Sequence, residues 1–203
     1  MELLISMSIC VGVLGASTML AGQVQSRYRV QVESGSAKQE ARYSIDLISR
    51  YLRSAGNNPL ALLITPCPVA GTPVTAIRRD PDGDGQDDDI RLQSDIAPTN
   101  GRIGGTAGAC TEANEDVTIA HDAGAFTITV DDLNAAGGPE ARTDAVISGL
   151  QFVYRDTAHA ITVVANNIAF VEVIVTAQSR VNDPATNAPM THVLRADVRV
   201  RNR

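Results

Sequence analysis

The chain has 203 residues, enough for one medium domain with an extension or for two very small domains. It carries 17 basic and 23 acidic residues, a formal net charge of −6, which gives no general electrostatic reason to bind nucleic acid or an anionic membrane surface. Aromatic residues make up 3% of the chain and Trp is absent, so the core must consist mostly of Val, Ile, Leu and Ala. Such a core suits a thin helix-on-sheet packing better than a large enzyme interior.

The N-terminal segment is an uncharged apolar run. No charged side chain lies between Glu2 and Arg27, and the run Leu3–Val24 is long enough, at about 1.5 Å per helical residue, to cross a hydrocarbon core of about 30 Å. A cleaved signal peptide would have a shorter apolar stretch and a basic start, whereas here the preceding residue is acidic and Ala16–Ala21 is a weak cleavage site. A buried core helix is a third interpretation, although so long an uncharged terminal stretch is unusual for one. We expect a retained membrane-inserting helix.

The apolar run continues without a breaker into an amphipathic stretch, Gln23–Ala55. Apolar residues recur there at spacings of three and four, on one helical face: Ala37, Ala41, Ile45, Ile48 and Leu52. The following Gly56–Pro59 (GNNP) is typical of a helix end, because Gly or Asn suits a left-handed cap and Pro cannot continue the helix. The two stretches predict one helix of about 50 residues. We therefore divide the chain into an N-terminal membrane helix, residues 1–56, and a β-rich head, residues 57–203.

After Pro59 the apolar period changes to two, as in half-buried antiparallel strands. The alternation is found in these segments: Ile90–Leu92, Phe126–Val130, Leu150–Tyr154, Val171–Val175 and Leu194–Arg201. Turn-rich loops lie between them, at Gly101–Gly108, Asn134–Glu140 and Val181–Pro189. A helix followed by a run of strands predicts an α+β fold, with the long N-terminal helix packed on a C-terminal antiparallel β-sheet head.

Segments near both ends of the chain are similar to those of a known protein family. Met1–Met7 (MELLISM) looks like the start of the mature helix of type IV pilins and type II secretion pseudopilins, where a glutamate lies near the N-terminus of an apolar segment. The stretch Glu40–Gly56 (EARYSIDLISRYLRSAG) is similar to the helix end of PilW-like minor pilins and of the J-type minor pseudopilin. Gly149–Arg155 and Val198–Arg203 also resemble their C-terminal segments. The resemblance covers the first 56 residues and roughly the last 60, and it is weak between them.

This resemblance implies a type IV pilin-like fold and a structural role in a filament. It gives Glu2 the place of the family's near-terminal glutamate, whose partner is the N-terminal amine of a neighbouring subunit. A carboxylate near the end of a membrane helix is unfavourable unless it finds a partner, although a Glu simply solvated at the membrane boundary is the alternative. The family's short basic leader ending in Gly, with a Phe-Thr-Leu-type start, would lie upstream of Met1.

The implied partners are other pilin or pseudopilin subunits, the inner membrane before assembly, and a prepilin peptidase if that leader exists. The head would be periplasmic or extracellular.

The chain has three cysteines in two environments. Cys10 lies inside the apolar run, where it behaves as a small hydrophobe. Cys67 and Cys110 lie in the polar remainder, and an exported head would meet an oxidising compartment in which such a pair tends to join. We predict a disulfide between them, with two free thiols as the alternative.

The segment Asp80–Asp89 (DPDGDGQDDD) has the spacing of a calcium loop. It satisfies D-x-D-x-D-G-x-x-D with acidic positions Asp80, Asp82, Asp84 and Asp88. Ca²⁺ takes about six to eight oxygens, and alternate carboxylates on a tight loop supply them. Gly85 permits the sharp turn, and the carbonyl of Gln86 is a further candidate ligand.

This loop differs from an EF-hand, because Arg91 occupies the twelfth position and no helices flank it. It is more similar to calcium loops between the strands of secreted proteins. The alternative is a solvated acidic turn whose charges repel one another, with Arg78, Arg79 and Arg91 as the only nearby counter-charges. We predict a structural Ca²⁺ site.

Signatures of catalysis are lacking. His121, His159 and His192 are scattered, with no two at metal-ligand spacing, and the sequence has no G-x-S-x-G elbow, P-loop or dinucleotide fingerprint. We expect no enzyme. The expected function is a minor-pilin-like structural subunit of a bacterial type IV pilus. The alternatives are a minor pseudopilin of a type II secretion system and a membrane-anchored calcium-dependent adhesion or binding module.

Overall fold

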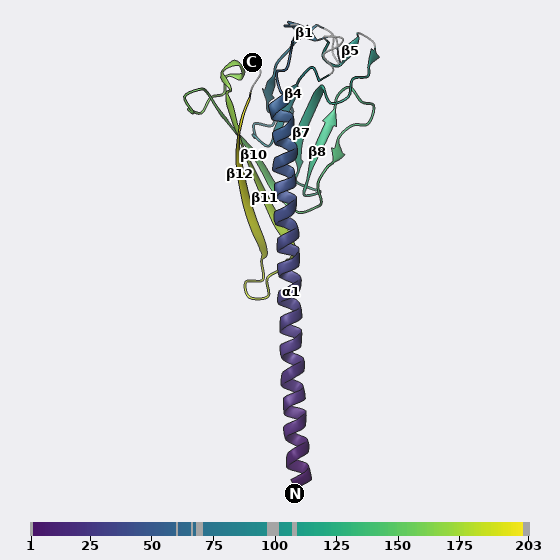
Figure 1. Ribbon diagram of the computed structural model, residues 1–203, viewed down its shortest axis with the longest axis vertical. Helices are drawn as coiled ribbons and strands as arrows, with labels where there is room; N and C mark the ends of the chain where they lie inside the picture. The colour runs from purple at the N-terminus through teal and green to yellow at the C-terminus, as the bar shows by residue number, and fades with distance from the viewer. Residues whose placement is uncertain are drawn as a thin grey trace.

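The computed structural model describes residues 2–59, 61–65, 67, 71–96, 102–106 and 109–200. One helix, α1 (Glu2–Ser54), extends for 53 residues and is about 80 Å long. Its N-terminal half projects from the head as a free rod, and its C-terminal half lies against the strands (Figure 1). The helix predicted from the two sequence stretches is confirmed.

The helix ends where the sequence predicted. Gly56 adopts a left-handed backbone with φ +76°, which glycine tolerates without a side-chain penalty. Its N–H donates to the carbonyl of Gln93 over 2.8 Å, and the N–H of Asp95 donates to the carbonyl of Asn57 over 2.7 Å. These bonds attach the end of the helix to the last residue of β4 (Asp89–Gln93) and to the chain just after it.

The head contains twelve strands and one short 3₁₀ helix in the described part of the chain. They are β1 (Ile64–Thr65), β2 (Thr72–Pro73), β3 (Ile77–Arg79), β4 (Asp89–Gln93), β5 (Gly105–Thr106), β6 (Ala109–Cys110), β7 (Asp116–Asp122), β8 (Thr127–Asp132), β9 (Glu140–Ala141), β10 (Ile147–Arg155), η1 (Ala165–Asn167), β11 (Phe170–Asn182) and β12 (Pro189–Arg199).

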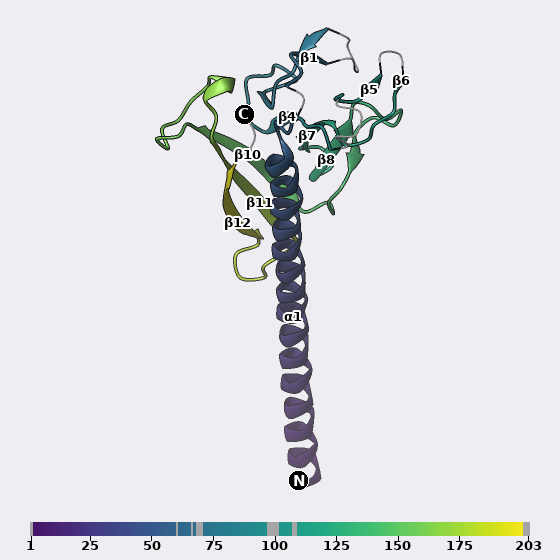
Figure 2. The ribbon, with the colours of Figure 1, turned by 45° about the horizontal axis from the view of Figure 1, so that its top comes forward.

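The expected antiparallel head is divided between two main sheets. The first has the order β10-β11-β12 and the second the order β3-β4-β7-β8-β9, and two small ribbons pair β1 with β2 and β5 with β6. In both views the three-stranded sheet lies to the left of the upper part of α1 and the five-stranded sheet to its right (Figures 1 and 2), and α1 packs mainly against β11 and β12. All pairings within the two sheets are antiparallel, so the α+β layout is confirmed.

Most predicted strands are confirmed, in β4, β8, β10, β11 and β12. Phe126 is the exception: it was expected inside a strand, but it lies in the β7–β8 turn with φ +58° and a 40% exposed side chain. The turn is set by Asp122, whose Oδ1 accepts the N–H groups of Gly124 and Ala125, each over 2.9 Å. The strand β7 itself was not predicted. The predicted end of the last strand, Arg201, and part of the Gly101–Gly108 loop lie outside the described residues.

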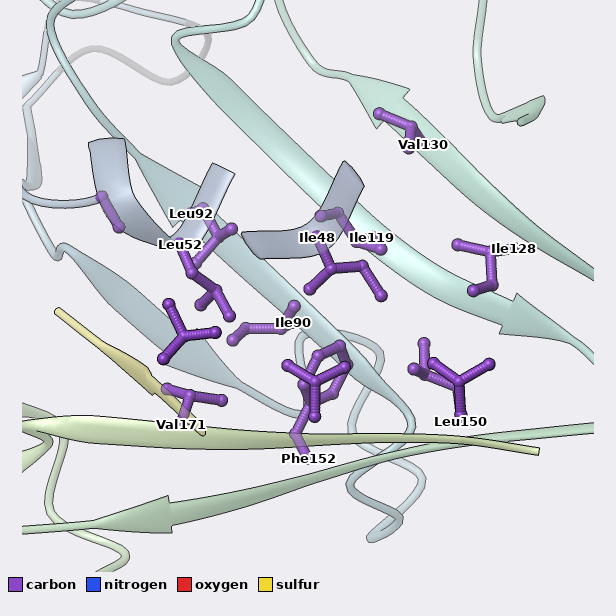
Figure 3. Close-up of a cluster of buried hydrophobic side chains, with 14 of the residues drawn as sticks. Ile48, Leu52, Ile90, Leu92, Ile119, Ile128, Val130, Leu150, Phe152 and Val171 are labelled. Carbon is purple, nitrogen blue, oxygen red and sulfur yellow. The ribbon is translucent and has the colours of Figure 1, made fainter. Parts of the chain in front are cut away.

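The core lies between α1 and the inner faces of the two sheets. Ile48 and Leu52 reach from the helix toward Ile90 of the five-stranded sheet and toward Phe152 and Val171 of the three-stranded sheet (Figure 3). Of the predicted helical face, Ala37, Ala41, Ile48 and Leu52 are fully buried and Ile45 is partly buried. The second half of the helix is therefore part of the core of the head, and the boundary at residue 56 separates elements that share one core.

Candidate functional site

The first candidate site is the free half of α1. A window of this helix is long and apolar enough to cross a membrane, and none of that window is buried within the chain. Leu3, Met7 and Met19 each expose at least seven-tenths of their surface, and the first buried helix residue is Val30. Exposed apolar surfaces of this size are typical of sites that contact lipid or another protein.

The hydroxyl groups in this half are satisfied within the helix. Ser6 donates to the carbonyl of Glu2 over 2.9 Å, and Ser8, Ser17 and Thr18 donate to carbonyls of the preceding turn over 2.8–2.9 Å. A polar side chain that bonds its own backbone needs no water, so these residues are compatible with lipid. These bonds could be predicted once the helix was predicted, because a helix places a backbone carbonyl three or four positions before each Ser or Thr.

The predicted disulfide is confirmed. Cys67 and Cys110 are joined, with 5.6 Å between their Cα atoms and a sequence separation of 43. Closing a loop of this length stabilises the head by about 4 kcal/mol in the chain-entropy model. Cys10 is a free, exposed thiol in the apolar half of α1.

The second candidate site is the acidic loop between β3 and β4. Oxygens of Asp80, Asp82 and Asp89 lie within 4.8 Å of one another, a spacing that fits ligands of one metal ion. Asp89 is only 3% exposed, and its Oδ1 has no hydrogen-bond partner, while its Oδ2 accepts the N–H of Asp82 over 3.2 Å. A buried carboxylate oxygen without a donor is costly, so the residues present fit a cation.

The structure brings together two of the predicted ligands and adds one that was missed. Asp84 instead accepts the N–H and the side-chain amide of Gln86, over 2.7 and 2.8 Å, and Asp88 also lies outside the close trio. Asp89 was missed because its side chain belongs to the first residue of β4. The burial of that residue depends on the neighbouring strand β7, with which it pairs at Ala120.

The carboxyl groups of this trio differ in proton affinity. Burial, together with the charges of Asp82, Asp80 and Asp88, raises the pKa of Asp89 to about 6. Burial also acts to raise the pKa of Asp80, but hydrogen bonds from the Asp82 side chain and from the N–H groups of Gly85 and Gly83 hold it below its ordinary value. The carboxylates of this loop therefore repel one another, and a bound cation would reduce that repulsion.

The acidic loop also contacts the other sheet. Arg79 binds Asp87 through Nε and Nη2, over 2.9 and 2.8 Å, and its guanidinium lies 5.3 Å from the ring centre of Tyr154 on β10. The carbonyl of Asp87 accepts the N–H of Phe152 over 2.7 Å. Arg91 forms a two-bond ion pair with Asp116, over 2.7 and 2.8 Å. Two of the three arginines considered as counter-charges thus bind carboxylates outside the trio.

The three histidines lie in separate places. His121 bonds the carbonyl of Ile147 over 3.0 Å, His159 stacks on Phe170 with 4.2 Å between ring centres, and His192 bonds Ser34 of α1 over 2.7 Å. Each has a local structural contact.

Comparison with protein-family models, with curated proteins and with solved structures finds no match for this chain.

Proposed function

We propose that the chain is a minor-pilin-like structural subunit of a bacterial type IV pilus, held in the inner membrane by α1 until it assembles. The observation that carries this proposal is the single continuous helix with two environments: its first half is apolar and free, and its second half forms part of the core of the head. The resemblance of Met1–Met7 and Glu40–Gly56 to pilins and pseudopilins supports the same function.

The mechanism is an exchange of partners by the apolar half of α1. In the membrane this surface contacts lipid, and in a filament it contacts the helices of neighbouring subunits, so little apolar surface meets water at any stage. Glu2 is exposed at the start of the helix. A carboxylate costs about 3 kcal/mol at the centre of a membrane helix. Pairing with the amine of a neighbouring subunit would remove this cost and favour assembly.

The test is to shear surface filaments from cells that carry the chain and its filament machinery, and to probe the sheared fraction with an antibody to the head. We expect the chain in that fraction, with residues 2–24 retained by intact mass. Removing one partner of a buried charge pair costs about 2–5 kcal/mol. Recovery of Glu2→Leu in filaments should therefore fall by at least about tenfold, with its amount in membranes unchanged.

Asp46→Asn is the matched control, because it removes an exposed carboxylate from the polar face of the same helix. It should enter filaments as the unsubstituted chain does. Absence of the chain from filaments while it remains in membranes would favour a simple membrane anchor, and loss of residues 2–24 would identify a cleaved signal peptide. Dependence of recovery on type II secretion genes would identify a pseudopilin.

A second candidate function, calcium binding by the head, is favoured by the trio Asp80, Asp82 and Asp89. The ion would be structural and would hold the loop that contacts β10. With Ca²⁺ at about 1 mM, a concentration that suits extracellular sites, the full-length chain in detergent should melt at a higher temperature than with chelator. Asp82→Asn should lose the contribution of this loop, and an undiminished Ca²⁺ response in that variant would exclude the trio.

A further inference from the structure

A second group of acidic side chains lies at one end of the five-stranded sheet, away from the loop between β3 and β4. Asp95 follows β4, Glu112 and Glu115 precede β7, and Asn134 follows β8. These ends meet because β7 pairs with both neighbours there, through Gln93 with Asp116 and Val117 with Asp132. Segments up to 39 residues apart in the sequence thus meet in one place.

These residues are linked by hydrogen bonds and by charge. Glu112 and Glu115 hydrogen-bond through their side chains, and both lie close enough to Asp95 for its charge to act on them. The side-chain amide of Asn134 donates to the carbonyl of Glu112 over 3.0 Å, and Glu115 accepts the N–H of Gly104 over 2.7 Å. Three carboxyl groups and one amide therefore lie in one region at this end of the sheet.

Three of these four residues are almost completely removed from water, and Glu112 is partly exposed. Asp95 is 0% exposed, Glu115 is 1% exposed and Asn134 is 8% exposed. Among the described residues, the buried side-chain oxygens without a hydrogen-bond partner include both oxygens of Asp95, Oε2 of Glu112 and Oδ1 of Asn134. All four are acceptors, and no donor among the described residues reaches them. Burial followed by the charge of Glu115 raises the pKa of Asp95, and burial followed by the hydrogen bond to Glu115 raises that of Glu112.

Two kinds of ligand could satisfy such oxygens: protons or a metal ion. One proton shared between Glu112 and Glu115 accounts for their contact, but it leaves both oxygens of Asp95 and the amide oxygen of Asn134 without a donor. Carboxylate and amide oxygens are the ligands of a hard cation, whereas zinc prefers nitrogen and sulfur. Mg²⁺ demands near-ideal octahedral geometry and usually keeps several waters, while Ca²⁺ accepts an irregular cage of protein oxygens.

We propose that Asp95, Glu112, Glu115 and Asn134 bind a Ca²⁺ ion at this end of the five-stranded sheet, separately from the Asp80, Asp82 and Asp89 site. Among the described residues, that loop trio is the acidic group whose oxygens already lie within 4.8 Å of one another. The carboxylate oxygens of Asp95, Glu112 and Glu115 do not all lie that close together, so these side chains would have to rotate toward the ion when it binds. The three negative charges are balanced by the two positive charges of the ion and by Arg102, whose positive charge favours the ionised form of Glu112.

The ion would stabilise the segments around the disulfide. Gly104, which donates to Glu115, lies so close to Cys67 that a side chain at position 104 would come within 2.8 Å of its Cβ. The ion would thus join the chain after β4, β6 and β8 at the point where the disulfide holds the preceding loop. This inference holds whether or not the chain enters a filament.

The test is to count bound ions on the full-length chain in detergent. The protein is stripped with chelator, dialysed against about 1 mM CaCl₂ and analysed for calcium by mass spectrometry. We expect about two ions per chain for the unsubstituted protein and about one for Asp95→Asn, Glu112→Gln and Asp89→Asn, with none for Asp95→Asn combined with Asp89→Asn. Asp46→Asn is the control with an unchanged count.

The variants separate the two sites. If the loop trio holds no ion, the count falls from about one to none in Asp95→Asn and does not change in Asp89→Asn. Equal counts in Asp95→Asn, Glu112→Gln and the unsubstituted chain would overturn the proposal. A melting temperature that depends on pH but not on Ca²⁺ in the Asp89→Asn background would also overturn it, because protons would then satisfy these oxygens. Glu112→Gln changes a partly exposed residue, so it serves as the second variant if Asp95→Asn fails to fold.

Discussion

At the scale of single residues, Gly104 occupies the tightest position among the glycines of the described chain. Its φ is +83°, and a Cβ there would lie 2.7 Å from Oδ1 of Asn134 and 2.8 Å from Cβ of Cys67. Both distances are below those of ordinary contacts, and the disulfide prevents Cys67 from moving aside. The position therefore requires glycine for two reasons, backbone conformation and space.

Gly104→Ala is predicted to destabilise the head by about 3 kcal/mol, through backbone strain and overpacking together. Gly71→Ala is the matched control, because Gly71 has a φ of +84° and nothing within 4 Å of its added Cβ. It should cost only the strain, about 1 kcal/mol. Denaturant unfolding of the full-length chain in detergent measures both, and equal losses would contradict the steric account.

Glu172 on β11 differs from Asp89 and Asp95, because its surroundings favour the ionised carboxylate. Its carboxylate accepts Nη2 of Arg155 over 2.8 Å and lies 3.4 Å from Nη1 of Arg195. The hydrogen bond from Arg155, and then the charges of both arginines, hold the pKa of Glu172 below its ordinary 4.5. Ionisation of Glu172 therefore favours the folded state.

The stabilisation by Glu172 is predicted to be present at pH above about 4.5 and to be lost as pH falls through the lower folded pKa. Glu172→Gln should lower the free energy of unfolding by about 1 kcal/mol at neutral pH, a modest value because the pair is partly solvated. The difference from the unsubstituted chain should vanish in acid. Glu140→Gln, which breaks the exposed pair with Arg142, should change stability much less at any pH. A loss in Glu172→Gln that is independent of pH would contradict this account.

At the scale of elements, α1 is one helix with two kinds of surroundings. Its apolar spacing changes along the chain from apolar all round to one-sided, and burial begins where the one-sided pattern begins. The same apolar side chain should therefore contribute to the stability of the head in the second half of the helix but not in the first.

Leu52→Ala is predicted to destabilise the head by about 3 kcal/mol, because it leaves a cavity among fully buried neighbours. Leu20→Ala makes the same change in the exposed apolar half and should leave the unfolding of the head unchanged to within about 0.5 kcal/mol. Calorimetry of the detergent-solubilised chain compares the two. A similar loss in Leu20→Ala would mean that the free half of the helix contributes to the fold of the head.

Single elements also show how far the sequence could predict this structure. The helix, its glycine cap and the strands with clean alternation were predictable, because each is a local period or a local turn signal. Phe126 continues the apolar alternation of Ile128 and Val130 in the sequence, but it lies in the turn that Asp122 stabilises and not in the strand. In the candidate metal loop, Asp80 and Asp82 were found from spacing, whereas Asp89 required knowledge of which strand covers it.

At the scale of the whole molecule, the apolar surface and the folded head are separated along one rod (Figure 1). Cys10 reports on the surroundings of the free half, because the other two cysteines form the disulfide. A probe attached there can distinguish lipid from water.

A spin label at Cys10 of the full-length chain in lipid bilayers is predicted to collide readily with oxygen and poorly with a water-soluble nickel chelate, because an apolar helix of this length spans the hydrocarbon region. Tyr43→Cys in a Cys10→Ser background is the control, since Tyr43 is exposed on the half of α1 that packs against the head. A label at position 43 should collide more readily with the nickel chelate than with oxygen. Ready access of nickel to Cys10 would show that the helix lies outside the membrane.

The sequence by itself determined the long helix, its point of termination, the pairing of the cysteines and the antiparallel character of the head. These features depend on periods of a few residues, or on there being only one sensible cysteine pair. The tertiary structure alone decided that the head has two main sheets and that Asp89 faces Asp80 and Asp82. It also decided that Asp95, Glu115 and Asn134 are buried in the same region as the partly exposed Glu112. The physical reason is that burial and electrostatic environment come from segments far apart in the chain, whose approach no local pattern encodes.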